Sequence, residues 1–356
     1  MKRIGIATFC KANNYGAILQ AYGLSQHLEK DRENEVEFLN IKFNPNYEKL
    51  QREKLKKDTI SRKIFDRIKK IKFERFRKKN LVISDEEIHG DKDSKQIQDK
   101  YDYYIVGSDQ VWNTDITNNT RAFFFDFVKE KTKISYAASY GRENINKIER
   151  TWSEEYLKDF KAVSVREKKS EMYLKQELNI NAKTVCDPVF LLNKDEWINK
   201  NKLKNKSKTY ILLYYMESNS TLEAIIENIK NIYDCPIIAI KGGTQELKNI
   251  KHAELIGPKD FLNIIYNAEL IITNSFHALA FSIIFNKKVI AFEHSKWNLR
   301  ISNLLELIDN SKKIVKLKDN INEILLKEKT IDGEIAYNNL LPLIKESKKF
   351  LGESIN

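Results

Sequence analysis

Short runs of apolar residues alternate with amphipathic stretches along the chain, the pattern of parallel strands and helices that follow one another. In the first half, a polar turn at 11–16 leads into a helix that ends near Lys30, and Arg166 and Glu167 open another helix. The apolar runs of this half predict strands at 3–9, 36–41, 103–106, 132–139, 162–165 and 184–186.

A Lys- and Asn-rich linker at 198–208 precedes a second series of the same kind. The predicted strands there are 210–215, 236–240, 269–273 and 288–292, and the predicted helices are 219–232, 258–267, 275–285, 299–309 and 337–351. This pattern predicts an α/β protein of two Rossmann-like domains that face a cleft. We expect the first domain over 1–195, the second over 196–330, and a helix within 331–356 that could pack back on the first domain.

One segment carries most of the positive charge. From Glu48 to Lys79 there are fifteen Lys and Arg against five Asp and Glu, out of a net charge of +12 for the chain. Ile60, Ile64, Ile68 and Ile71 recur in it at helical spacing, which predicts a basic amphipathic helix inserted at about 46–80. Such a helix could pack on the domain with a solvated basic face. Alternatively, 48–79 could contact the anionic inner face of a membrane or a polyanionic acceptor.

Composition narrows the class of protein. A chain of 356 residues with 42% hydrophobic residues is expected to form more than one core. The remaining charge is nearly balanced, which disfavours nucleic-acid binding. Cys10, Cys186 and Cys235 have neither metal-ligand nor disulfide spacing, so no metal site is predicted. The chain begins with a strand rather than a signal peptide and has no apolar run of about 20 residues, so we expect a cytoplasmic protein.

The most informative candidate is His277. An apolar strand ends at Thr273, and His277 falls in the first turn of the helix that follows. The carboxyl ends of parallel strands are where open α/β sheets bind ligands, and free helix N–H groups attract anions. The alternative is a core histidine at a strand–helix junction.

Four other charged residues follow predicted strands or loops. Asp109 could act as a general base or cap its own turn, and Arg166 could bind an anion or pair with Glu167. Lys241 before two glycines could hold a phosphate, and Arg300 could contact an anion or pair on the surface.

Taken together, these motifs resemble the polysaccharide pyruvyl transferase family. The matching stretches lie in the family's order at 14–22, 106–113, 164–167, 186–192 and 273–278. The resemblance implies a glycosyltransferase-B-like fold. It also implies a transferase that uses phosphoenolpyruvate, as co-substrate and without a further cofactor, to build a pyruvyl ketal on a sugar. That sugar would belong to a capsule, an exopolysaccharide or a lipid-linked precursor.

The resemblance also implies roles for residues. His277 would be the acid/base, Asp109 would take a hydroxyl proton, and Arg166 would bind the anionic donor, with help from Lys241 or Arg300. The residues predicted to bind substrate are Asn13, Asn14, Tyr15, Gly16, Ser108, Gln110, Tyr140, Lys241, Ser275, Phe276 and Arg300.

The chain departs from the family at one position. Many members have Arg-Leu-His where this chain has Ser275-Phe276-His277, and serine supplies no charge. Another cation must then bind the donor, or the donor or its geometry differs. Two rival functions stay open: a nucleotide-sugar glycosyltransferase of the same architecture, and a non-catalytic protein that binds a polyanion through 48–79.

Overall fold

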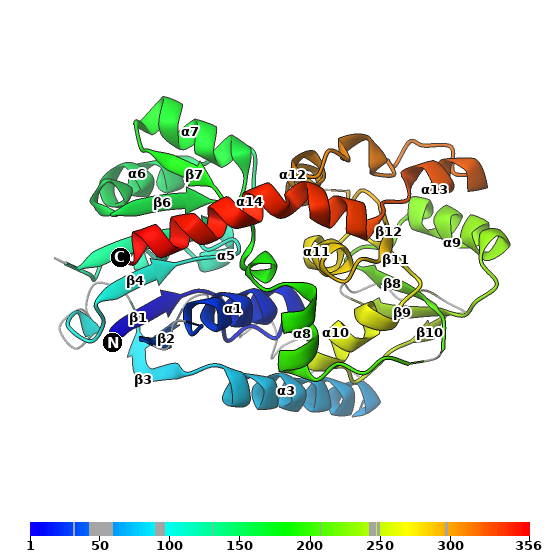
Figure 1. Ribbon diagram of the computed structural model, residues 1–356, viewed down its shortest axis with the longest axis horizontal. Helices are drawn as coiled ribbons and strands as arrows, with labels where there is room; N and C mark the ends of the chain where they lie inside the picture. The colour runs from blue at the N-terminus through cyan, green and yellow to red at the C-terminus, as the bar shows by residue number, and fades with distance from the viewer. Residues whose placement is uncertain are drawn as a thin grey trace. The chain divides into compact units, whose positions relative to one another are not determined.

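A computed structural model describes residues 1–30, 33–42, 60–89, 97–129, 131–206, 208–241, 247, 250–295 and 298–356. Of residues 60–63 and 241 it describes the backbone alone. The chain forms two compact units: Met1–Leu192 with Leu343–Asn356 (unit 1), and Asn193–Pro342 (unit 2). Each unit has its own parallel sheet (Figure 1).

Unit 1 contains a seven-stranded parallel sheet in the order β3-β2-β1-β4-β5-β6-β7. The strands are β1 (Lys2–Ala7), β2 (Asn34–Ile41), β3 (Ile83–Ile88), β4 (Tyr103–Val106), β5 (Thr132–Ala138), β6 (Ala162–Val165) and β7 (Ala182–Thr184). Its helices are α1 (Tyr15–Leu28), α3 (Ile60–Asn80), α5 (Thr114–Thr117), α6 (Lys147–Tyr156) and α7 (Lys168–Leu178), with 3₁₀ turns η2 (Ala122–Phe124), η3 (Leu157–Asp159) and η4 (Pro188–Leu191). The strand order reverses between β1 and β4, and that switch point is where sheets of this type bind ligands.

Unit 2 repeats this plan with five parallel strands in the order β10-β9-β8-β11-β12. The strands are β8 (Ile211–Tyr215), β9 (Ile237–Lys241), β10 (Lys251–His252), β11 (Leu270–Thr273) and β12 (Lys288–Ala291). The helices are α8 (Lys194–Asn201), α9 (Ser220–Ile232), α10 (Pro258–Asn267), α11 (Phe276–Ile284), α12 (Leu299–Leu307) and α13 (Glu323–Lys329), with a 3₁₀ turn η5 (Ser311–Lys313). Here the order reverses between β8 and β11, so the His277 motif lies at the switch point.

The two cores differ in composition. Unit 1 buries an aromatic cluster that includes Trp112, Phe123, Phe124 and Phe125, and the Trp112 ring stacks on Phe124 at 5.4 Å. The core of unit 2 is mainly aliphatic, with Ile225 and Ile272 among its fully buried members.

The last helix, α14 (Gly333–Ser354), begins in unit 2 and ends in unit 1. In unit 1 the backbone N–H of Cys186 donates to Ser347 Oγ at 2.9 Å, and Lys2 Nζ donates to the carbonyl of Ile355 at 2.8 Å. Within the described part of the chain, no helix is both long enough and apolar enough to cross a membrane.

Strand β3 was not predicted from the sequence. Its residues, Ile-Ser-Asp-Glu-Glu-Ile, are mostly polar because β3 lies at the edge of the sheet and pairs only with β2. Only Ser84 and Ile88 of this strand are buried.

Helix α3 packs on unit 1 through two phenylalanines. The helix forms as predicted over its described length, whereas residues 48–59 of the basic segment lie outside the described residues. Within the isoleucine stripe, Ile64 and Ile71 are exposed and Ile68 is half-buried. Phe73 and Phe76 pack on α1, with their ring centroids 5.1 Å from that of Tyr15 and 5.5 Å from that of Tyr22.

Candidate functional site

Asp109 follows β4 at the switch point of unit 1, in an unusual turn. Gly107 has φ = +135°, and a Cβ atom there would lie 1.9 Å from the carbonyl oxygen of Tyr136. The Gly107–Ser108 peptide bond is cis, and Asp109 itself has φ = +73°. The Asp109 carboxylate accepts the backbone N–H of Gln110 at 2.9 Å, the local turn bond that the sequence left as an alternative to catalysis.

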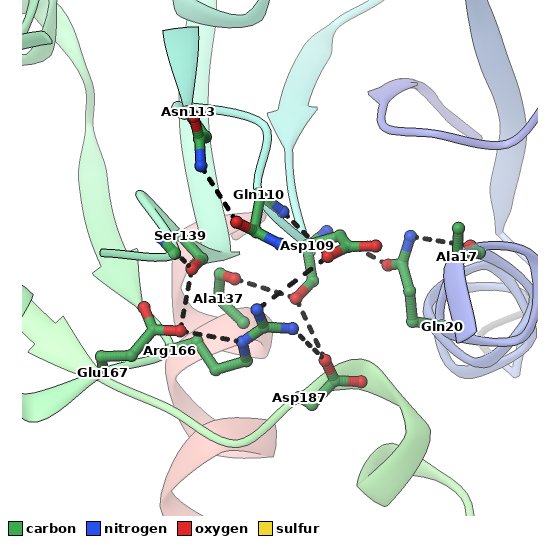
Figure 2. Close-up of polar contacts among 12 residues, drawn as sticks. Ala17, Gln20, Asp109, Gln110, Asn113, Ala137, Ser139, Arg166, Glu167 and Asp187 are labelled. Atoms are coloured by element: carbon green, nitrogen blue, oxygen red, sulfur yellow. Dashed lines mark hydrogen bonds and ion pairs between the residues drawn. The ribbon is translucent and has the colours of Figure 1, made fainter. Parts of the chain in front are cut away.

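Arg166 lies at the centre of a buried ionic cluster with three carboxylates (Figure 2). Its Nη1 atom is 2.9 Å from Asp187 Oδ2, its Nε atom is 3.2 Å from Glu167 Oε1, and its Nη2 atom is 4.0 Å from Asp109 Oδ1. The Arg166 side chain is 3% exposed. The predicted pair with Glu167 therefore exists, and Asp187 and Asp109 share the same guanidinium.

The charge balance of this cluster bears on the predicted donor site. Burial by itself lowers the pKa of Arg166, but attraction by Glu167, Asp187 and Asp109 outweighs burial and raises the pKa above its ordinary value. One cation thus faces three carboxylates. Because those carboxylates already engage the guanidinium, the geometry does not favour Arg166 as the group that binds an anionic donor.

Hydrogen bonds join this cluster to α1 and to Thr8, the residue after β1. Ser108 Oγ donates to the carbonyl of Ala137 at 2.9 Å and lies 3.3 Å from Asp187 Oδ2, and its backbone N–H donates to Gln20 Oε1 at 3.2 Å. Gln20 in turn donates to Thr8 Oγ1 at 2.8 Å. Ser108 is fully buried, so it supports the turn rather than facing solvent.

A second chain of polar contacts holds Gln110. Asn113 Nδ2 donates to Gln110 Oε1 at 3.0 Å, and Ser139 Oγ donates to Glu167 Oε1 at 2.8 Å (Figure 2). Gly141, with φ = +67°, leaves room for Gln110, because a Cβ atom there would lie 1.9 Å from Gln110 Oε1. Gln110 is therefore fixed close to Asp109 by its neighbours on two loops.

Two predicted substrate-binding residues are core residues instead. Tyr140 is fully buried, its hydroxyl lies 2.6 Å from Ser153 Oγ, and its ring packs against Trp112 at 5.3 Å. Tyr15 is 3% exposed and packs on Phe73. Aromatic residues beside polar loop residues are hard to assign from sequence, because both a core and a site use them.

The loop before α1 is held by α3. Arg77 donates to the carbonyls of Cys10 and Lys11 at 3.1 and 3.0 Å, and to Asn13 Oδ1 at 2.9 Å. Asn14 caps α1 by accepting the backbone N–H of Ala17 at 3.1 Å, and Gly16 is buried in the first turn of that helix. Asn13 and Asn14 are exposed, as a substrate contact requires.

In unit 2, His277 lies in the first turn of α11, directly after β11, as predicted. It is 7% exposed, and its ring stands edge-on to Phe276 with centroids 5.0 Å apart. Ser275 occupies the N-cap position of α11, but its side chain makes no capping hydrogen bond. The first backbone N–H groups of the helix are therefore not capped by the Ser275 hydroxyl.

Neighbouring side chains fix this turn to β8. Thr273 Oγ1 donates to the carbonyl of Tyr214 at 2.6 Å and accepts the backbone N–H of Ser275 at 3.0 Å. Asn274 accepts the backbone N–H of Met216 at 2.8 Å. The ends of two adjacent strands are thereby locked together beside His277.

A second histidine at this edge was not predicted from the sequence. His294 follows β12, and its Nδ1 atom lies 3.3 Å from Glu217 Oε2, at the end of β8. Glu217 also accepts the backbone N–H of Ser295 at 2.7 Å. His294 comes three residues after β12, much as His277 comes four residues after β11, so the signal that singled out His277 also applied to it.

The remaining candidates are only partly described. Arg300 is half-buried in the first turn of α12 in unit 2. The side chain of Lys241, at the end of β9, and the two glycines after it lie outside the described residues. Among the side chains that are described, no group of three or more His, Cys, Asp or Glu is placed to hold a metal ion.

Comparisons with known structures agree with this architecture. A UDP-GlcNAc 2-epimerase from Neisseria meningitidis has a TM-score of 0.59 at 11% identity, covering 99% of both chains. A glycosyltransferase from Rickettsia africae has a TM-score of 0.51 at 12% identity, covering 99% of this chain and 93% of the other. This likeness confirms the predicted glycosyltransferase-B-like fold with two Rossmann-like units.

Sequence comparison identifies the family. No curated protein matches the chain significantly. Residues 14–296, which include the Asp109 turn, Arg166 and His277, match the family described as polysaccharide pyruvyl transferase. The chain therefore belongs to the polysaccharide pyruvyl transferase family, and it is a transferase.

Proposed function

We propose that this transferase uses phosphoenolpyruvate to form a pyruvyl ketal on a sugar of a cell-surface polysaccharide or of its lipid-linked precursor. The observation that carries the proposal is the family match, which spans both switch-point motifs. The reaction protonates the methylene carbon of the donor, and a sugar hydroxyl then forms a bond to the neighbouring carbon. Phosphate leaves with the electrons of its C–O bond, and a second hydroxyl closes the ketal and releases its proton.

His277 is the proposed acid/base for the proton transfers. An imidazole titrates near neutral pH, and a positioned acid or base contributes on the order of 10²–10⁴ in rate. Its place in the first turn of α11 puts it beside backbone N–H groups that favour an anion. Those N–H groups could supply part of the positive potential that Ser275 cannot.

Asp109 is the proposed acceptor of a hydroxyl proton, and we assign Arg166 a different role from the one that the resemblance implies. With Asp187 and Glu167 on two of its nitrogens, Arg166 is a positioning residue that holds the Asp109 carboxylate 4.0 Å from Nη2. The anionic donor then requires another cation, for which Arg300 is the candidate with a described side chain.

The test is release of inorganic phosphate from phosphoenolpyruvate, with a panel of lipid-linked saccharides as acceptors and mass spectrometry of the product. We expect phosphate release that depends on the acceptor, and a product that carries the pyruvyl group. UDP-GlcNAc serves as the competing donor. Sugar transfer from UDP-GlcNAc, with no reaction of phosphoenolpyruvate on any acceptor, would refute the proposal.

A further inference from the structure

The outward side of α3 carries an exposed apolar stripe. Ile64 and Ile71 are 52% and 43% exposed, and Phe65 is 38% exposed. Phe73, which is fully buried against α1, is nine residues from Ile64, or about two and a half turns, so the two side chains lie on opposite sides of the helix. The stripe is therefore a second apolar face, separate from the one that packs.

The other face of α3 packs against α1. Phe73 and Phe76 contact Tyr15 and Tyr22, and the ammonium of Lys69 lies 5.0 Å from the centre of the Tyr15 ring. At the end of the helix, Arg77 holds the loop that precedes α1. These contacts fix the orientation of α3, and with it the outward direction of the isoleucines.

Cations surround the outward stripe. From Ile64 to Lys79 the helix has eight Lys and Arg, against Asp66 and Glu74 as its acidic residues. Arg67, Lys70, Arg75, Lys78 and Lys79 are all exposed. An apolar stripe bordered by cations is the composition of helices that lie in the interface of an anionic bilayer, where the stripe enters the acyl region and the cations meet lipid phosphates.

We propose that α3 docks this protein on an anionic membrane surface, with Ile64, Ile68 and Ile71 inserted and Arg75, Lys78 and Lys79 on the headgroups. The net positive charge favours a lipid surface over a second copy of the chain, because two such faces would repel each other. The exposed isoleucines favour a bilayer over a soluble polyanion, which offers no apolar phase. The proposal goes beyond the proposed reaction and does not depend on it.

The test is flotation of the full chain with vesicles, in the absence of donor and acceptor. We expect binding to an equimolar mixture of phosphatidylcholine and phosphatidylglycerol, little binding to phosphatidylcholine alone, and weaker binding as salt rises. The combined variant Arg75→Gln, Lys78→Gln, Lys79→Gln removes three interfacial cations and should weaken binding about a hundredfold. The variant Ile64→Ser, Ile71→Ser should weaken it roughly tenfold or more.

Matched controls come from unit 2. Ile335 is 60% exposed, and Lys316 and Lys318 are exposed. The variant Ile335→Ser and the double variant Lys316→Gln, Lys318→Gln should therefore leave vesicle binding unchanged. No binding to anionic vesicles, or equal losses in the controls, would overturn the proposal. The proposal would also be overturned if the protein bound heparin and the isoleucine variant bound vesicles as well as the wild type. A dimer in light scattering that the isoleucine variant dissociates would overturn it too. Since flotation needs no substrate, failure here leaves the proposed reaction untouched.

Discussion

Arg166 Nη1 and Asp187 Oδ2 lie 2.9 Å apart, in side chains that are 3% and 0% exposed. The pair joins the end of β6 to the residue that caps η4, since Asp187 Oδ1 also accepts the backbone N–H of Val189 at 3.1 Å. The pair is surrounded by more negative than positive charge, because Glu167 and Asp109 share the same guanidinium. Loss of the arginine and loss of one carboxylate should therefore have different consequences.

Arg166→Met should be more destabilising than Asp187→Asn. The arginine variant leaves three buried carboxylates without their cation, and breaking a buried ion pair in this way costs about 3–5 kcal/mol. The asparagine variant leaves Arg166 with two carboxylates and keeps most hydrogen bonds, so we expect a loss of about 1–3 kcal/mol. Urea unfolding at pH 7 measures both. Equal losses would show that the cluster is not short of positive charge.

His277→Asn should lower turnover by about 10²–10⁴ with little change in the unfolding midpoint. The measurement is acceptor-dependent phosphate release at saturating phosphoenolpyruvate. His89→Ala is the matched control, because the His89 side chain is 62% exposed after β3 and has no place in the proposed reaction. Unchanged turnover in the His277 variant would remove it from the mechanism.

Gly107→Ala should destabilise unit 1 strongly, by about 3 kcal/mol or more. The added Cβ would meet the Tyr136 carbonyl, and φ = +135° is strained for any other residue. Gly352→Ala is the control, since a Cβ there meets nothing within 4 Å and the residue lies in α14. We expect that variant to be more stable by about 0.5–1 kcal/mol. Similar melting temperatures for the two variants would contradict the strained turn.

Glu171 should make stability depend on pH in the acid range. Burial alone would raise the pKa of Glu171, but hydrogen bonds from Thr184, Lys168 and Lys175 outweigh burial and lower the pKa to about 2. The unfolded value is about 4.3, so the carboxylate stabilises the fold above that pH, and the contribution is lost as pH falls toward 2. The difference in melting temperature between the wild type and Glu171→Gln should therefore narrow from pH 6 to pH 2. A constant difference would rule out this linkage.

The sheet strands were predictable where they are central, and the two that escaped, β3 and β10, lie at sheet edges. Runs such as 103–106 and 269–273 are apolar because both faces of a parallel strand are covered. Strand β3 needs to bury only one side, so its polar sequence gave no signal. Likewise, the isoleucine spacing in α3 predicted the helix correctly but did not show that Phe73 and Phe76 are the residues that pack, because two apolar faces on one helix cannot be ranked by periodicity.

In the candidate site, too, local features were predictable from the sequence and contacts between distant residues were not. His277 and Asp109 were placed correctly at strand ends, since that depends on local order along the chain. The partners of Arg166 were not predictable, because Asp187 is 21 residues away and meets the guanidinium only after β6 and β7 pair. His294 carried a usable signal, and Tyr140 shows that a conspicuous residue in a loop can belong to the core.

The path of α14 has a consequence for how the protein forms during synthesis. Unit 1 is not contiguous in the chain: its last fourteen residues, Leu343–Asn356, follow all of unit 2. Those residues include Ser347, Leu351 and Ile355, which are buried. Ser347 and Ile355 also accept hydrogen bonds from Cys186 and Lys2 of unit 1. Unit 1 therefore cannot complete its fold until α14 has been synthesised, whereas the whole sequence of unit 2 is available earlier.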